Sequence, residues 1–162
     1  TRSDRDWSSD VCSSDLDCCS VVCASPAYLA EHGTPQRVDE LAQRNCLTHS
    51  YFGHSLWSFT RKSDGAPVSV AVDGNVSAND AASLMGLARA GAGIAMLPTY
   101  LTAQLVHGGE LVPLFPDFEP QVVGMYAVYT SRKHMPATLR TMLDFLARRF
   151  TEVPAWDLPL AA

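Results

Sequence analysis

The sequence predicts an α/β fold, and three patterns support this. Residues 76–98 read in turn as a strand, a capped helix, a glycine turn and a second apolar strand. Residues 56–72 read as a hairpin, because two runs of β-forming residues flank an Asp-Gly turn. Residues 135–150 form a helix whose apolar side chains recur at the helical period. Alternating strands and helices of this kind predict a mixed sheet covered by helices.

The composition is that of a globular domain. The chain has 162 residues, of which 47% are hydrophobic and 18% charged, enough for one domain with a substantial core. No apolar run approaches the roughly 18 residues needed to cross a bilayer, so no membrane association is expected. The net charge of −5 argues against a broad phosphate-binding surface, and we do not expect this chain alone to hold DNA.

The first residues differ in composition from the rest. Thr1 to Asp17 is rich in Ser and Asp, repeats Ser-Ser-Asp and shows no periodicity, which predicts a disordered or non-native head over residues 1–19. Residues 10–16 also resemble a translated sequencing-library adapter. A basic start followed by an apolar core, as in a secretory signal, is absent from this head, so a cytoplasmic location is the default expectation.

Four of the five cysteines lie in or beside this head, and Cys46 stands alone in the body. Their spacing does not match the paired Cys-x-x-Cys knuckles of structural zinc sites, so we expect no metal. Free thiols are the expected state, with Cys23 and Cys46 behaving as small buried apolar groups.

The first half of the chain contains several short elements. A strand is expected at 21–24, followed by a helix with Ser25 as its cap, Pro26 in its first turn and Gly33 at its end. One or two helical turns follow over 38–42, and a strand over 46–51. The hairpin of 56–72 comes next, with Trp57 as a packing residue rather than a platform for a ligand.

Residues 74–98 are the most informative stretch. A strand at 74–76 leads to a helix capped by Asn79, whose apolar positions we expect to be Ala82, Met85 and Gly86. Gly91 and Gly93 are expected to end this helix, because glycine tolerates the left-handed backbone of a helix stop. The apolar run 94–97 predicts a strand covered on both faces, and Pro98 suits the first turn of the next helix.

The last third alternates again. A helix is predicted over 99–106, a strand over 111–114, a proline-rich connector without period over 115–120, and a strand over 125–130. A final helix starts at Met135, and residues 151–162 read as a loose tail. Four apolar side chains form one face of that helix, which we expect to be partly exposed: Leu139, Met142, Leu143 and Leu146.

Several short motifs occur in a consistent order along the chain. They are Val22-Cys23-Ala24-Ser25-Pro26-Ala27-Tyr28-Leu29, Gly33 with Pro35, Cys46-Leu47, Trp57-Ser58-Phe59, Asn79-Asp80, Gly91-Ala92-Gly93-Ile94-Ala95-Met96-Leu97-Pro98 and Gly109-Glu110-Leu111-Val112. Together they resemble the effector-binding domain of LysR-type transcriptional regulators. The resemblance runs from about residue 21 to residue 150.

The resemblance implies a fold and a role. The fold would be periplasmic-binding-protein-like (type II), with 20–124 as effector-binding subdomain II and 125–150 as the returning strand and helix of subdomain I. The chain would be a ligand-sensing fragment that lacks the winged helix-turn-helix through which the full-length, homo-oligomeric regulator contacts DNA. A solute-binding protein of a transporter is the alternative, because it would share this fold.

The resemblance also implies where a small-molecule effector would bind. The candidate residues lie at strand ends and helix starts: His49, Ser50, Tyr51, Asn79, Asp80, Ala81 and Pro98. Backbone N–H groups at a helix start favour a carboxylate, so a small carboxylate or aromatic acid is the expected effector. Plain helix capping is the alternative role for Asn79, and a dipole-compatible surface position is the alternative for Asp80.

Catalysis is not expected. His49 and His54 flank Tyr51, but no Gly-x-Ser-x-Gly elbow, His-Glu-x-x-His motif or nucleotide-binding glycine loop accompanies them. Gly91-Ala92-Gly93 follows a helix, whereas a dinucleotide-binding loop follows a strand. The sequence therefore predicts a binding protein without a cofactor.

Overall fold

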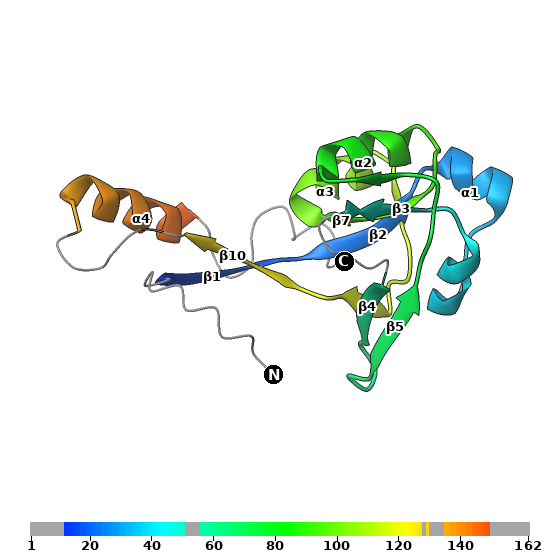
Figure 1. Ribbon diagram of the computed structural model, residues 1–162, viewed down its shortest axis with the longest axis horizontal. Coiled ribbons are helices and arrows are strands. Elements are labelled where there is room, and N and C mark those ends of the chain that lie inside the picture. Colours follow the sequence, from blue (N-terminus) through cyan, green and yellow to red (C-terminus); the bar gives the residue numbers. More distant parts are fainter. Residues whose placement is uncertain (1–11, 51–55, 128, 130–134, 150–162) are drawn as a thin grey trace. The chain divides into compact units, whose positions relative to one another are not determined.

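The computed structural model describes residues 12–50, 56–127, 129 and 135–149 (Figure 1). Within this part of the chain, residues 18–122 belong to one compact unit, and residues 12–17 with 123–149 belong to another. The two units are described separately below. The predicted tail at 151–162 lies outside the described residues.

The larger unit is built on a five-stranded mixed sheet in the order β6-β3-β7-β2-β8. Its central strand β7 is parallel to β3 and antiparallel to β2, and β3 is also parallel to β6. The mixed sheet that the sequence predicts is thus confirmed. The strands are β2 (Ser20–Ala24), β3 (Cys46–His49), β6 (Ser77–Ala78), β7 (Ile94–Pro98) and β8 (Val112–Pro113).

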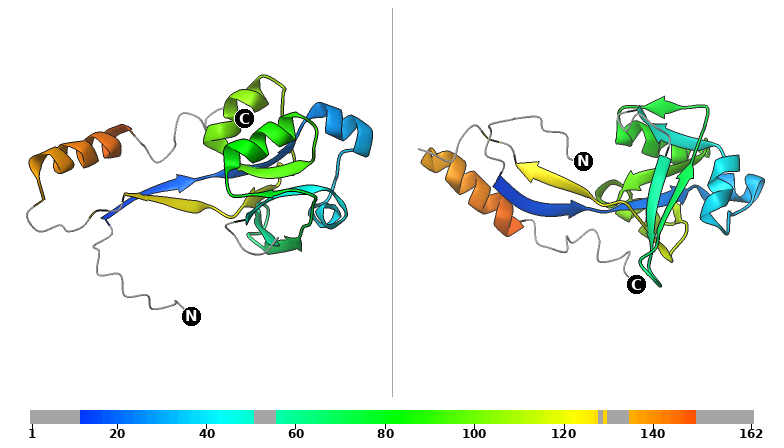
Figure 2. Two further views of the ribbon diagram at one scale, coloured as in Figure 1. Left: turned by 45° about the horizontal axis from the view of Figure 1, so that its top comes forward. Right: turned by 60° about the horizontal axis from the view of Figure 1, so that its bottom comes forward.

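This sheet is covered on both faces, because consecutive strand residues enter opposite cores. On one face Leu47 and Leu97 join Leu84 of α2 (Ala81–Arg89), and residues of α3 (Thr99–His107) pack against the same cluster. On the other face Cys46 and Ile94 join α1 (Pro26–His32), η1 (Val38–Gln43) and a hairpin. Figures 1 and 2 show α2 and α3 on one side of these strands and the hairpin on the other.

The hairpin belongs to a second, three-stranded sheet in the order β5-β4-β9. Strands β4 (Leu56–Arg61) and β5 (Pro67–Ala71) pair antiparallel around the predicted Asp-Gly turn. Trp57 is 5% exposed and packs in the core, as expected. The connector at 115–120, predicted to lack structure, contains β9 (Phe118–Pro120) paired with β4. Its partner lies some 60 residues away in sequence, and a three-residue strand has no visible period of its own.

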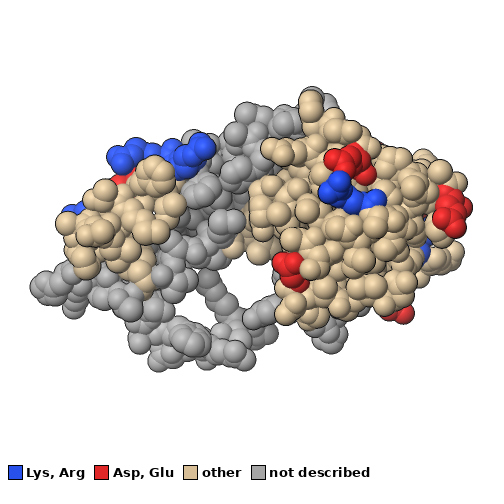
Figure 3. All heavy atoms as spheres, turned by 90° about the horizontal axis from the view of Figure 1, so that it is seen from above, with Lys and Arg blue, Asp and Glu red and all other residues tan. Residues whose placement is uncertain are grey.

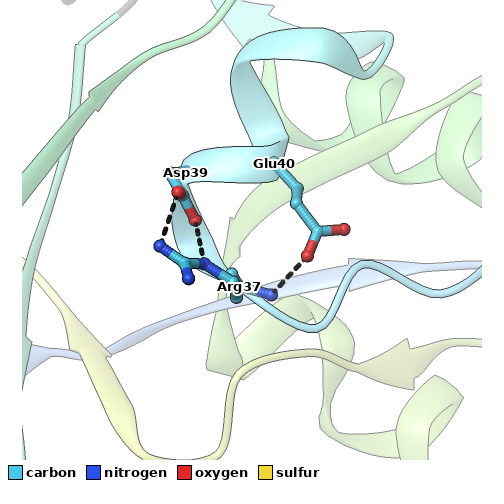
Figure 4. Close-up of polar contacts among 3 residues, drawn as sticks. All are labelled: Arg37, Asp39 and Glu40. Carbon is cyan, nitrogen blue, oxygen red and sulfur yellow. Dashed lines mark hydrogen bonds and ion pairs between the residues drawn. The ribbon is translucent and has the colours of Figure 1, made fainter.

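The first helices begin as their cap chemistry indicates. In α1 the Ser25 hydroxyl accepts a hydrogen bond from the Tyr28 N–H at 3.3 Å, and Gly33 follows the helix with φ +78°. At η1 the Arg37 N–H donates to Glu40 Oε1 at 3.1 Å, and its guanidinium donates twice to Asp39 at 2.9 Å (Figure 4). This pairing lowers the pKa of the Asp39 carboxyl. The predicted turns at 38–42 are therefore a 3₁₀-helix.

Residues 74–98 require four corrections. The strand is Ser77–Ala78 rather than 74–76. The residue that caps α2 is Asp80 rather than Asn79, because the Asp80 carboxylate accepts hydrogen bonds from the N–H and hydroxyl of Ser83, both at 2.8 Å. The buried side chains of α2 are Leu84 and Ala88, while the face predicted to be apolar is largely exposed. Pro98 ends β7, one residue before α3 begins.

The smaller unit contains a two-stranded sheet and one helix. Strand β1 (Cys12–Cys18) pairs with β10 (Val123–Ala127), so part of the head predicted to be disordered is a strand. Helix α4 (Ala137–Arg149) forms where the helical period predicts it. No α4 residue with a described side chain is buried, and Met142 and Phe145 are 58% and 59% exposed. The prediction of a partly exposed apolar face is confirmed.

Candidate functional site

Three neighbouring strands of the larger unit end at one edge of the sheet. Strands β6, β3 and β7 are adjacent and parallel, and their carboxyl ends are Ala78, His49 and Pro98. His49 lies directly opposite Ala78 in the register. The edge formed by these strand ends, together with the start of α2, is called the effector edge below. In α/β folds, ligands commonly bind at the carboxyl ends of parallel strands.

The topology thus brings together candidate residues from three separate segments. Asn79 and Asp80 follow β6 directly, Ala81 begins α2, Ser50 follows β3 and Pro98 ends β7. Ser50, Asn79 and Asp80 are exposed, whereas His49, Ala81 and Pro98 are half-buried. Tyr51, the remaining candidate, and His54 lie outside the described residues. The effector edge therefore presents a hydroxyl, an amide, a carboxylate and an imidazole.

The start of α2 carries its own negative charge. The hydrogen bonds from Ser83 hold the pKa of Asp80 below its ordinary value, and the nearby His49 lowers it further. Because Asp80 already accepts the Ser83 N–H, this amide is not available to an anionic ligand. The capping role that the sequence assigned to Asn79 belongs to Asp80, which leaves the exposed Asn79 amide outside the cap.

The junction between β7 and α3 is held by hydrogen bonds to both of its flanking residues. The Thr99 N–H donates to the Cys19 carbonyl at 3.0 Å, and the Thr102 hydroxyl donates to the Pro98 carbonyl at 3.2 Å. Thr99 and Thr102 are both buried. These contacts position Pro98 at the end of its strand without a side-chain cap on α3.

The opposite edge of the same strands contains a residue that sequence reasoning missed. Asn45, which precedes β3, hydrogen-bonds to Asn75, Ala92 and Ile94. Its partners lie 30 to 49 positions away in the chain, so no local motif could have indicated this role.

The buried thiols have no reactive environment. Cys23 and Cys46 are both fully buried, and burial raises the pKa of each to about 12. Both predictions for these residues, a free thiol and an apolar packing role, are confirmed. Across the described ranges, no three His, Cys, Asp or Glu side chains gather closely enough to hold a metal ion.

Charged side chains are sparse on the face of the larger unit seen in Figure 3. One ion pair there is between Arg89 of α2 and Glu110, at 2.5 Å. On that face the described residues show no extended basic patch of the kind that binds nucleic acid. Within the described part of the chain, no helix has the length and apolar character to span a membrane.

The sequence matches the family model described as the LysR substrate binding domain over residues 14–151. The probable HTH-type transcriptional regulator LtrA of Klebsiella pneumoniae is 30% identical over 131 residues, which cover 78% of this chain and 42% of LtrA. The chain thus spans less than half the length of this relative. The match begins inside the head, close to the start of β1.

Two solved structures share the fold. The regulatory domain of CrgA from Neisseria meningitidis has a TM-score of 0.71 and 32% identity, over 84% of this chain and 67% of that domain. Full-length AphB, a virulence activator of Vibrio cholerae, has a TM-score of 0.76 and 23% identity, over 90% of this chain and 49% of AphB. The AphB match supports the fold, whereas the family model covers most of the chain. The chain belongs to the LysR substrate-binding domain family.

Proposed function

We propose that this chain is the ligand-sensing part of a LysR-type transcriptional regulator and that a small-molecule effector binds at the effector edge. In the whole protein, which we place in the cytoplasm as a homo-oligomer, an N-terminal winged helix-turn-helix would contact DNA. Effector binding alters such contacts only if the effector has different affinities for two states of the protein.

One observation carries the location of the site. The ends of β6, β3 and β7, adjacent and parallel, bring His49, Ser50, Asn79, Asp80, Ala81 and Pro98 to one edge of the sheet. These residues combine neutral hydrogen-bonding groups with one carboxylate, a set suited to recognising a polar small molecule. We also assign Tyr51 to this site, because it follows Ser50 in the sequence.

The effector's charge is the finer part of the proposal. The sequence predicts a carboxylate, held by N–H groups at the start of α2. Since the Asp80 carboxylate occupies that start, a carboxylate effector would have to be held by the neutral donors of Ser50 and Asn79 and by His49. A small acid and its uncharged amide therefore make the informative pair of probes.

Two other classes of protein are less well supported. A solute-binding protein of a transporter would share the fold, but the relatives matched here are transcriptional regulators. An enzyme would need a nucleophile, an acid–base pair or a metal, and the effector edge contains only one of its carboxylates beside one imidazole. We therefore propose a non-catalytic role without a cofactor.

The proposal is tested by calorimetry of the full-length regulator. Fractions of a bacterial metabolite extract, and then benzoate and benzamide, are titrated into the wild type and into the double variant Ser50→Ala/Asn79→Ala. Because the double variant removes two neutral donors, we expect about tenfold weaker binding of any fraction that the wild type binds.

Thr60→Ala is the matched control, since it removes an exposed hydroxyl from the three-stranded sheet. Equal affinity of the wild type, the control and the double variant for the same fraction would place the effector elsewhere. Binding of benzamide but not benzoate would remove the carboxylate part of the proposal and retain the site.

A further inference from the structure

Asn45 ties three segments together at the amino ends of β3 and β7. Its backbone carbonyl accepts the Ile94 N–H at 3.0 Å. Its side-chain amide donates to the Ala92 carbonyl at 2.6 Å and to Asn75 Oδ1 at 3.0 Å. Its Oδ1 accepts the Asn75 N–H at 2.9 Å. The side chain is half-buried, and these contacts use its donors and its acceptor together.

Two glycines let the chain approach Asn45 this closely. A Cβ on Gly93 would lie 2.6 Å from the Asn45 carbonyl oxygen and 3.1 Å from its side-chain nitrogen. A Cβ on Gly74 would overlap the carbonyl oxygen of Cys46. Neither glycine has a positive φ, so both are required by space rather than by backbone conformation. The arrangement is therefore a tightly packed junction around one polar side chain.

The segments joined at this junction are the ones that end at the effector edge. From Asn45 the chain runs through β3 to His49, from Gly93 through β7 to Pro98, and from Asn75 through β6 to Asp80. Strand β3 has four residues and β7 has five. Over such short strands the register set at one end determines the height of the other end, since each residue advances the strand by about 3.3 Å.

We propose that Asn45 is a positioning residue for the effector edge: by joining the starts of β3, β7 and the segment leading to β6, it sets the relative positions of His49, Asp80 and Pro98. This inference rests on the proposed function for its biological meaning. Its structural content concerns the free protein, so it can be tested without a ligand.

The test is amide hydrogen exchange by NMR on the 162-residue chain, with Asn45→Ala as the variant. The reporter is the Thr48 N–H, which donates to the Val76 carbonyl at 3.1 Å between β3 and the segment before β6. The reference is the Leu29 N–H in α1, which donates to the Ser25 carbonyl at 3.1 Å. We expect exchange at Thr48 to become about tenfold faster relative to Leu29.

A second spectroscopic measurement reports on position rather than stability. The NMR pH titration of the Asp80 carboxyl is sensitive to the nearby His49, so a shift of the edge changes the apparent pKa of Asp80 in Asn45→Ala. Gln43→Ala, which removes an exposed amide next to the junction, is the control and should leave both signals unchanged.

Asn75→Ala keeps the inference testable if Asn45→Ala does not fold. It removes only the side-chain acceptor at 3.0 Å, so a smaller change at the same two reporters is expected. Equal acceleration at Thr48 and Leu29, or an unaltered Asp80 titration in a folded variant, would overturn the positioning role. Because neither readout involves an effector, a failed effector-binding experiment leaves this result separate and interpretable.

Discussion

At the scale of single residues, glycines with similar sequence surroundings have different physical roles. Gly91 adopts φ +81° after α2, as the prediction of a helix stop requires. Gly93, predicted to have the same role, is instead required by the close approach of Asn45. Gly86 lies on the exposed face of α2, where a Cβ would meet no atom within 4 Å. The sequence indicates where glycines occur, but only packing shows which of them need to be glycine.

This difference predicts opposite effects of two alanine substitutions. Gly74→Ala forces a Cβ against the Cys46 carbonyl and should lower the free energy of unfolding by about 1–3 kcal/mol. Gly86→Ala adds a methyl group in open space on a helix and should raise it by up to about 1 kcal/mol. Urea denaturation of the two variants beside the wild type measures both. A stable Gly74→Ala protein would show that the junction can relax.

At the scale of elements, helix starts were predicted well in type and less well in position. Ser25 caps α1 as predicted, because Ser-Pro is a strong local signal. At α2 both Asn79 and Asp80 are good caps by residue type. Ala78 pairs with His49 in the sheet, and the helix starts at Ala81, which leaves Asp80 at the cap position. A contact between strands decided between two locally equivalent residues.

The corrected cap predicts a pH-dependent contribution to stability. The pKa of Asp80 lies below its ordinary value of 3.8, so its carboxylate stabilises the fold above that pH. This contribution is lost as the pH falls through the depressed pKa of the folded state. Asp80→Ala should therefore lower the thermal midpoint at pH 7 and converge with the wild type in strong acid.

Asn79→Ala is the matched control for this prediction, since Asn79 is exposed and adjacent but does not cap α2. It should leave the thermal midpoint unchanged at both pH values. A larger loss from Asn79→Ala than from Asp80→Ala would restore Asn79 as the cap.

At the scale of the whole molecule, the two units differ in how much they bury. The sheet of the larger unit has a hydrophobic cluster on each face, with Leu47 and Leu97 on one and Cys46 and Ile94 on the other. In the smaller unit, α4 has no buried residue among its described side chains. An exposed helix of this length is held weakly, because most helical stability comes from packing of the apolar face.

Hydrogen exchange should reveal this difference directly. Amides in the interior of α4 should exchange faster than those in the interior of α2, because opening α4 exposes little buried surface. The measurement uses mass spectrometry of peptides from 137–149 and 81–89, at several protein concentrations. Concentration-independent protection of the α4 peptide equal to that of the α2 peptide would contradict the expectation. Protection that rises with concentration would show association through the exposed apolar face.

The sequence by itself determined the α/β class, the order of most elements, the hairpin and the family, because hydrophobic period, turn residues and caps are local signals. Only the tertiary structure decided the pairing of β9 with β4, the role of Asp80 as the α2 cap and the junction at Asn45. The candidate site divides in the same way. Its residues were identified from the sequence, but their assembly at one edge depends on the parallel pairing of β6, β3 and β7, which involves residues far apart in the chain.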